Sequence, residues 1–116
     1  MEMVKTSEFD AAEQEAKVST GNYTHEFATP FVYADKSYDK MEFDFEKLTG
    51  KDFLEIEAEM QAQGKPLIAP EFSGDFMLLM ASRASGVPSD VLQALPLSTF
   101  KRIHSKARSF LLKQGL

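Results

Sequence analysis

Apolar and polar positions alternate along the chain between residues 22 and 46. In the stretch YTHEF the first, third and fifth positions are aromatic or histidine, and in MEFDFE apolar and acidic residues take turns. A period of two with aromatic enrichment is typical of a strand with one buried face. The polar stretch ADKS lies between the two. The pattern predicts an antiparallel hairpin or small meander over about 22–46, whose apolar face other elements must cover.

From residue 49 the period lengthens to that of a helix. Thr49 followed three residues later by Asp52 resembles a capping box, with Asp in place of the preferred Glu. Phe53, Ile56 and Met60 then form a stripe at helical spacing. The glycine and proline at 64 and 66 supply a stop. We therefore expect a helix over about 50–63.

Three further helical segments follow, separated by Gly86 and two prolines. DFMLLMASRA is apolar on most sides, which predicts a central core helix over 73–85. A short helix is expected over 89–94 and a last one over 98–114, with Ser98 as its N-cap. The sequence thus predicts an α+β fold, a hairpin followed by a bundle of three to four α-helices in one domain at 21–116. Residues 1–20 are polar and predict a flexible or partly helical arm.

Composition narrows the class of protein. A chain of 116 residues with 43% apolar content makes one domain with a real core. It holds no cysteine, which excludes disulfides and thiolate metal sites. No apolar run approaches the roughly 20 residues of a membrane span, and the acidic N-terminal stretch is unlike a signal peptide. We expect a soluble intracellular protein.

Charge is divided unevenly along the chain. Residues 1–97 hold 8 basic and all 18 acidic side chains, a net charge of −10, whereas residues 98–116 hold five basic side chains and no acid. Such asymmetry is typical of an interaction segment, although cations near a helix C-terminus also favour the macrodipole. The candidate electrostatic docking residues are Lys101, Arg102, Lys106 and Arg108.

The residues assemble no catalytic or metal-binding constellation. The two histidines, His25 and His104, belong to no zinc-binding motif, and the Walker, G-x-S-x-G and G-x-G-x-x-G loops are absent. Glu55, Glu57 and Glu59 fan out around one helix rather than facing each other. We expect no enzyme, no catalytic residue, no cofactor and no metal.

Nucleic-acid binding is an alternative for the basic last helix. SDVLQALPLSTFKRIHSKAR has the order of elements of a helix-turn-helix DNA-binding motif, in which a basic recognition helix follows a short turn. Against it, the acidic body would repel phosphate, and the turn contains Pro96 rather than the common glycine. A small helical nucleic-acid-binding module is therefore the second hypothesis, and a generic adaptor is the third.

Methionine and phenylalanine are plentiful in the helices. Methionine suits both a packed core and a surface that accepts several partner shapes, and the pattern leaves open which positions serve which role. The candidate partner-binding residues are Phe76, Met77, Met80, Phe100, Ile103, Phe110 and Leu111.

The order of segments resembles the tail assembly chaperones of long-tailed bacteriophages. The resemblance starts with the aromatic strand pair YTHEFATPFVYADKSYDKMEFDF, continues through LTGKDFLEIEAEMQAQG, and ends with FMLLMASRASGVPSDVLQALPLSTFKRIHSKARSFL. It spans about residues 23–112, and its most specific part is a pattern close to A-x-x-A-G-x-P followed by L-P-x-x-F. The residues matching that pattern are Ala81, Ala84, Gly86, Pro88, Leu95, Pro96 and Phe100.

The resemblance implies a non-catalytic chaperone made in the cytoplasm of an infected bacterium. Such proteins bind the long, largely helical tape-measure protein, keep it soluble and assist assembly of tail-tube subunits around it. They are typically absent from the mature virion, and many are also made in a longer, frameshifted form. The resemblance therefore implies the tape-measure protein as partner and the tail-tube protein as a candidate second one. Self-association into oligomers stays open, and the residues themselves favour protein over nucleic acid and predict no membrane partner. The resemblance carries no catalytic residues over to this chain.

Overall fold

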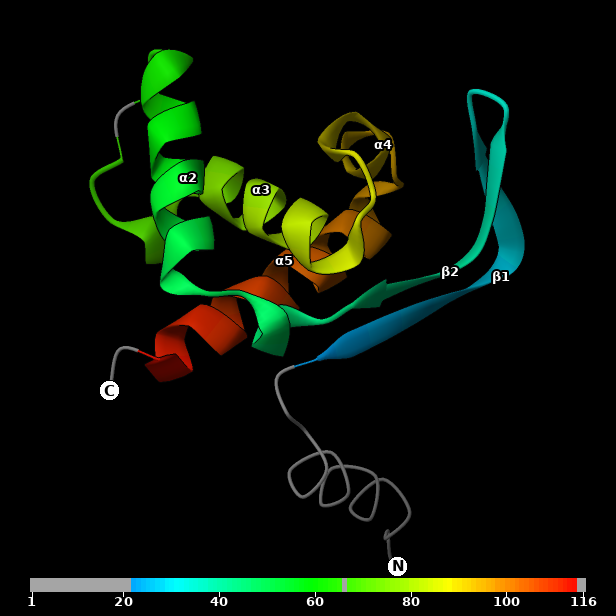
Figure 1. Cartoon of the computed structure of the whole chain (residues 1–116). Coiled ribbons are helices and arrows are strands. Elements are labelled where there is room, and N and C mark those ends of the chain that lie inside the picture. The colour runs from blue at the N-terminus through cyan, green and yellow to red at the C-terminus, as the bar shows by residue number, and fades with distance from the viewer. Residues whose placement is uncertain (1–21, 66, 115–116) are drawn as a thin grey trace, which may run out of the picture.

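An antiparallel hairpin leads into α-helices that pack together beside it (Figure 1). The computed structural model describes residues 22–65 and 67–114, so the arm expected at 1–20 lies outside the described residues. The strands are β1 (Tyr23–Tyr33) and β2 (Lys36–Phe43), and the α-helices are α2 (Gly50–Ala62), α3 (Gly74–Ser85), α4 (Ser89–Gln93) and α5 (Leu97–Gln114). Two 3₁₀ turns, η1 (Phe45–Lys47) and η2 (Pro70–Phe72), join them. This arrangement confirms the expected α+β fold, and each of the four expected helices differs from its observed bounds by one residue at one end.

The hairpin presents one aromatic face to the helices. Tyr23 pairs with Phe43 and His25 with Met41, so the alternating residues of both strands share that face. The register shifts between Glu26 and Phe31, in a stretch that contains Pro30, which has no N–H to donate to a ladder. Thr24 and Glu26 lie on the exposed side, as the alternation predicts.

The core surrounds α3, which packs against β2, η1, α2, α4 and α5. Phe76, Met77 and Met80 of α3 are buried, with 0%, 1% and 4% of their surface exposed. Met41 and Phe43 of β2 add to this core from the hairpin, and the backbone N–H of Asp44 donates to the Ala84 carbonyl at 3.0 Å. The hairpin is therefore attached to the helices by side-chain burial and by a backbone hydrogen bond.

Local signals in the sequence set most helix ends. The backbone N–H of Thr49 donates to Asp52 Oδ2 at 2.8 Å at the start of α2. Ser73 Oγ accepts from the Phe76 N–H at 3.0 Å at the start of α3. Gly86 ends α3 in the left-handed conformation, with φ of 79°, which glycine adopts without a Cβ clash.

The start of the last helix differs from the expectation. α5 begins at Leu97, and the Pro96 carbonyl accepts its first hydrogen bond, from the Phe100 N–H at 2.9 Å. Ser98 lies inside the first turn and is not the N-cap. Proline suits the position before the first turn because its fixed φ costs nothing there and its carbonyl is still available.

None of the helices in the described ranges is both long and apolar enough to cross a bilayer.

Candidate functional site

An apolar groove of about 280 Å³ lies between the first half of α2 and the end of α5. Phe76 and Met80 of α3 contribute its buried floor, and Phe110 and Leu111 of α5 are half-buried at its side. We call it the α2–α5 groove, and its lining consists of Leu48, Thr49, Gly50, Asp52, Phe53, Ile56, Phe76, Met80, Phe110, Leu111 and Gln114. The lining is mostly aliphatic and aromatic, which is the composition of sites that accept apolar groups.

Ring contacts hold the floor and one wall in place. The Phe53 ring lies 5.0 Å from that of Phe76 at a tilt of 57°, and the Phe45 ring stacks on Phe110 at 5.6 Å. Phe45 has no exposed surface. Aromatic pairs at these separations add to the stabilisation that burial alone provides. The groove is therefore a preformed feature of the fold, because its lining rings are also packed against the core.

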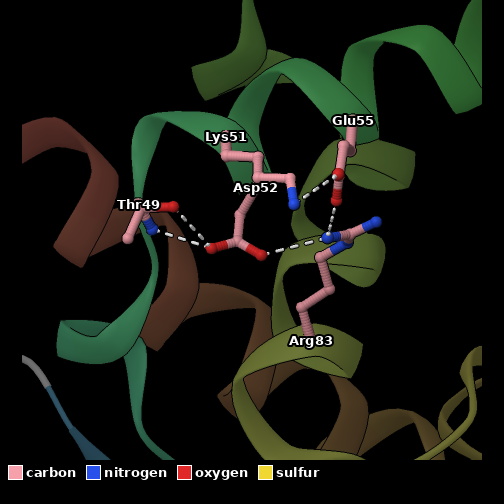
Figure 2. A network of polar contacts seen from close by, with 5 residues as sticks. All are labelled: Thr49, Lys51, Asp52, Glu55 and Arg83. Atoms are coloured by element: carbon pink, nitrogen blue, oxygen red, sulfur yellow. Dashed lines mark hydrogen bonds and ion pairs between the residues drawn. The ribbon is translucent and has the colours of Figure 1, made fainter.

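A polar network fixes the α2 side of the groove (Figure 2). Nη1 of Arg83, in the last turn of α3, donates to Asp52 Oδ1 at 3.0 Å and to Glu55 Oε1 at 2.7 Å. Oδ2 of Asp52 accepts from both the N–H and the hydroxyl of Thr49, at 2.8 and 3.1 Å. Lys51 Nζ lies 3.7 Å from Glu55. The network joins the first turn of α2 to the end of α3, so the spacing of the two helices is fixed on this side.

The network also sets the protonation of its members. The pKa of the Asp52 carboxyl is lowered, first by the Thr49 backbone N–H and then by the Arg83 guanidinium. Hydrogen bonding to Glu55 is the main cause that raises the pKa of Arg83. Asp52 is therefore ionised at neutral pH, and the edge of the apolar groove carries a fixed negative charge that Arg83 compensates.

The structure divides the predicted partner-binding residues into two groups. Phe76, Met80, Phe110 and Leu111 line the α2–α5 groove. Met77, Phe100 and Ile103 instead border a cavity of about 10 Å³ beside His104, which is too small for a ligand. Phe76, Met77, Met80 and Ile103 are at most 4% exposed, so they are core residues in this conformation. Phe110 and Leu111 are only half-buried, as are Leu48 and Phe53, so these four are the apolar groove members that remain accessible to solvent.

The basic side chains of α5 lie along two edges rather than in one patch. Arg108 Nε donates to the Glu71 carbonyl at 3.0 Å, and its guanidinium lies 5.4 Å from the centre of the Phe72 ring. Lys106 Nζ lies 5.4 Å from the centre of the Tyr23 ring, on the side of the hairpin. Lys101 and Arg102 are exposed. Two of the four predicted docking residues, Arg108 and Lys106, therefore contact different neighbours, η2 and β1.

Some exposed apolar residues were not singled out from the sequence. Ile68 is 94% exposed and Phe72 is 79% exposed on the connector between α2 and α3, and Leu54 is 62% exposed on α2. No periodicity marks Ile68, because the connector has neither the helical nor the strand period. Arg83 was also missed, since nothing in the sequence tells which carboxylates a lone arginine will meet.

The surroundings of the two histidines indicate a structural role for both. Nδ1 of His25 lies 2.9 Å from the Tyr23 hydroxyl, and the His25 ring meets Phe27 edge-on at 4.7 Å. Burial, followed by nearby cations, lowers the pKa of both His25 and His104. Within the part of the chain that the structure describes, His, Asp and Glu form no group of three that could hold a metal ion.

No protein-family model, curated protein or solved structure significantly matches this chain.

Proposed function

We propose that this chain is a non-catalytic tail assembly chaperone of a long-tailed bacteriophage, and that the α2–α5 groove binds an apolar stretch of the tape-measure protein. The observation that carries the proposal is the groove itself, a preformed apolar depression of about 280 Å³ on a small, acidic helical domain. An engineered cavity of about 150 Å³ accepts benzene. The groove therefore has room for one or two large apolar side chains.

The chemistry of the client supports this assignment. A tape-measure chain displays long apolar stripes before the tube surrounds it, and exposed stripes of this kind aggregate. Helix-in-groove binding covers such a stripe by seating apolar side chains spaced three or four residues apart. The net charge of −5 keeps the complex soluble. In this proposal the protein acts in the cytoplasm of the infected host, assists assembly of tail-tube subunits, and leaves before the virion is complete.

The test is co-expression with the tape-measure protein encoded in the same genome, with soluble and co-purifying tape-measure protein as the readout. The key variant is Leu111→Glu, which places a carboxylate in the groove, and the matched control is Leu112→Glu. Leu112 is the next residue of the same helix and is 41% exposed outside the groove. Because burying an unpaired charge is costly, we expect Leu111→Glu to reduce co-purification by about tenfold or more. Leu112→Glu should leave co-purification unchanged.

Two outcomes contradict the proposal. In the first, the tape-measure protein stays insoluble with the unaltered chaperone; in the second, both glutamate variants co-purify equally well. Circular dichroism of each variant checks folding, and Leu111→Ala replaces Leu111→Glu if the latter does not fold.

A second candidate function, nucleic-acid binding, is favoured by the exposure of Lys101 and Arg102 in the first half of α5. Helix-turn-helix proteins contact bases with the N-terminal residues of the recognition helix. The measurement is the mobility of labelled duplex DNA at increasing salt. Binding that weakens steeply with salt and is lost in Lys101→Glu would favour this function over the chaperone.

A further inference from the structure

A cleft of about 500 Å³ lies between the hairpin and the segment that joins α3 to α4. One wall comes from residues between 36 and 47, in β2 and the turn that follows it, and the other from residues 84–87. The hairpin projects away from the helices towards its turn (Figure 1). We call this space the β2 cleft, and its volume lies in the range of ligand-binding pockets.

The β2 cleft runs along an edge of β2 that carries backbone groups facing away from β1. At the end of the strand the Asp44 N–H donates to the Ala84 carbonyl at 3.0 Å, so it points towards α3 rather than towards β1. Backbone groups alternate in direction along a strand, and those of Lys40 and Glu42 therefore point the same way as those of Asp44. Both residues line the cleft. Outward-facing groups of this kind can pair with another strand.

The outer edge of β1 is blocked, whereas that of β2 is continuous. The register of β1 shifts between Glu26 and Phe31, and Pro30 within that stretch has no N–H to donate. β2 runs from Lys36 to Phe43 without a proline or a glycine. Bulges and prolines are common means of preventing an edge from pairing. Of the two outer edges of this sheet, that of β2 is therefore the one suited to accept a strand.

The side chains around the edge favour an acidic partner. Lys40 Nζ lies 3.2 Å from Glu42, so these two charges compensate each other. Within the described residues, Lys36 and Lys47 form no ion pair, and the cleft holds Asp44 as its other carboxylate. Lysines at an edge hinder the pairing of uncharged strands, because their charges would lose water without gaining a partner. A strand that carries carboxylates would instead complement them.

A second copy of the chain does not fit this edge in the usual two-fold arrangement, in which the two β2 strands would run antiparallel. To pair with both Lys40 and Glu42, the strand of the second copy or its turn would have to continue past Asp44. The Ala84 carbonyl already lies against the edge at that point. A short segment that ends or bends away there avoids the collision.

We propose that the β2 cleft binds a short extended segment of another protein, with acidic and apolar side chains in alternation, which adds to β2 as a third strand. Backbone hydrogen bonds to Lys40 and Glu42 hold the segment, as in other cases of strand addition. Its carboxylates complement Lys36 and Lys47, and its apolar side chains contact the half-buried Tyr38. The β2 cleft shares no lining residue with the α2–α5 groove, so this inference goes beyond the chaperone proposal and does not depend on it.

The test is titration of the ¹⁵N-labelled full chain with a capped peptide of alternating valine and glutamate, followed by amide hydrogen exchange. The amides of Lys40 and Glu42 should exchange about tenfold more slowly or less with the peptide bound, because new hydrogen bonds protect them. Thr24 and Glu26 are the internal reference. They pair with Glu42 and Lys40 in the hairpin, so their outward groups lie on the opposite edge of the sheet, and their exchange should not change.

Two matched peptides test whether the backbone makes the contact. One carries N-methyl groups on its valines and the other on its glutamates. Successive N–H groups of a strand point to opposite edges, so only one of the two peptides loses the N–H groups that face β2. We expect that peptide to lose binding and the other to keep it. Binding of both N-methylated peptides with unchanged affinity would overturn the proposal.

A matched pair of variants tests the charges. Lys47→Glu and Lys51→Glu change the net charge equally at exposed positions, and Lys51 lies outside the cleft. We expect Lys47→Glu to weaken peptide binding by about threefold or more, and Lys51→Glu to change it little. Equal effects of the two variants, or no shift of the cleft amides at about 1 mM peptide, would overturn the proposal. A free protein that sediments as a dimer with Lys40 and Glu42 already protected would also overturn it, and would assign the edge to a second copy.

Discussion

Nη1 of Arg83 donates to Oδ1 of Asp52 at 3.0 Å, across the 31 positions that separate α3 from the first turn of α2. The other oxygen of the same carboxylate accepts the N–H of Thr49. A single carboxylate therefore both caps α2 and attaches it to α3. Helix caps and charge-assisted hydrogen bonds each stabilise a fold, and here the loss of one side chain removes both. The wall of the α2–α5 groove depends on this residue.

Replacing Asp52 should therefore cost more stability than replacing its neighbour in the network. Asp52→Ala removes the cap and one of the Arg83 contacts, whereas Glu55→Ala removes only contacts to Arg83 and Lys51. We expect Asp52→Ala to lower the midpoint of thermal unfolding by several degrees, and Glu55→Ala to lower it less. Differential scanning calorimetry measures both. A larger loss for Glu55→Ala would mean that the cap contributes little.

The pKa of Asp52 adds a dependence on pH. Its folded-state pKa is lowered, so the unfolded chain takes up the proton first as the pH falls. The stability that Asp52 contributes is thus fully present above about pH 4, the ordinary range for Asp, and is lost as the pH falls through the lowered value. Stability of the unaltered protein should decline more steeply below about pH 4 than that of Asp52→Ala. Urea titrations at a series of pH values measure both stabilities. If the two proteins lost stability in parallel as the pH falls, the contribution of Asp52 would be contradicted.

Gly86 should be intolerant of any side chain for reasons of backbone conformation alone. Its φ is +79°, and a Cβ built there would meet no atom within 4 Å. Gly86→Ala should therefore destabilise by about 1 kcal/mol through left-handed strain, without any packing clash. Gly50→Ala is the matched control, because that site is equally open and has no positive φ. Urea unfolding should show a loss for Gly86→Ala and none for Gly50→Ala.

The hairpin turn carries strain that a substitution can remove. Ala34 has φ of 54°, a conformation that costs a residue with a Cβ more than it costs glycine. After allowing for the greater freedom of glycine in the unfolded chain, Ala34→Gly should stabilise by about 0.5 to 1 kcal/mol. Ala28→Gly, in β1 at negative φ, should destabilise instead. The same urea experiment would contradict the prediction if both substitutions destabilised.

Local patterns account for the parts of the fold that the sequence predicts well. Alternation placed Met41 and Phe43 on the buried face, and a glycine after a helical pattern placed the end of α3 at Gly86. Each of these features depends on residues within a few positions of one another. The boundary of α5 was wrong by one residue because serine and proline both favour helix starts.

The candidate site depends on contacts between distant residues, which a single sequence does not encode in any short pattern. The α2–α5 groove joins Leu48 and Phe53 to Leu111, roughly 60 positions later. Periodicity identified Phe76 and Phe110 as apolar helix residues, but it could not separate the buried floor from the accessible side. The sequence likewise predicted the basic residues of α5 as one set of docking charges, because it does not show which distant element each one meets. In the structure Arg108 and Lys106 contact different elements.

The two histidines offer a paired test of the charges along α5. Burial and Arg102, in that order, lower the pKa of His25, whereas burial, Lys101 and Arg108 lower the pKa of His104. Arg102→Gln should therefore raise the pKa of His25 and leave that of His104 unchanged, and Lys101→Gln should do the reverse. Titration of the imidazole Hε1 signals by NMR measures both values in one sample.

The sign of the accompanying stability change follows from linkage. Both imidazoles have lowered folded-state pKa values, so the unfolded chain binds protons more readily, and stability should decline as the pH falls through about 6.5. Arg102→Gln should reduce the part of this decline that comes from His25, because the folded and unfolded pKa values of that residue move closer together. If each variant shifted the pKa values of both histidines equally, the assignment of Arg102 to His25 and of Lys101 to His104 would be contradicted. Such a result would mean that the field of the whole helix, rather than the neighbouring cation, sets each pKa.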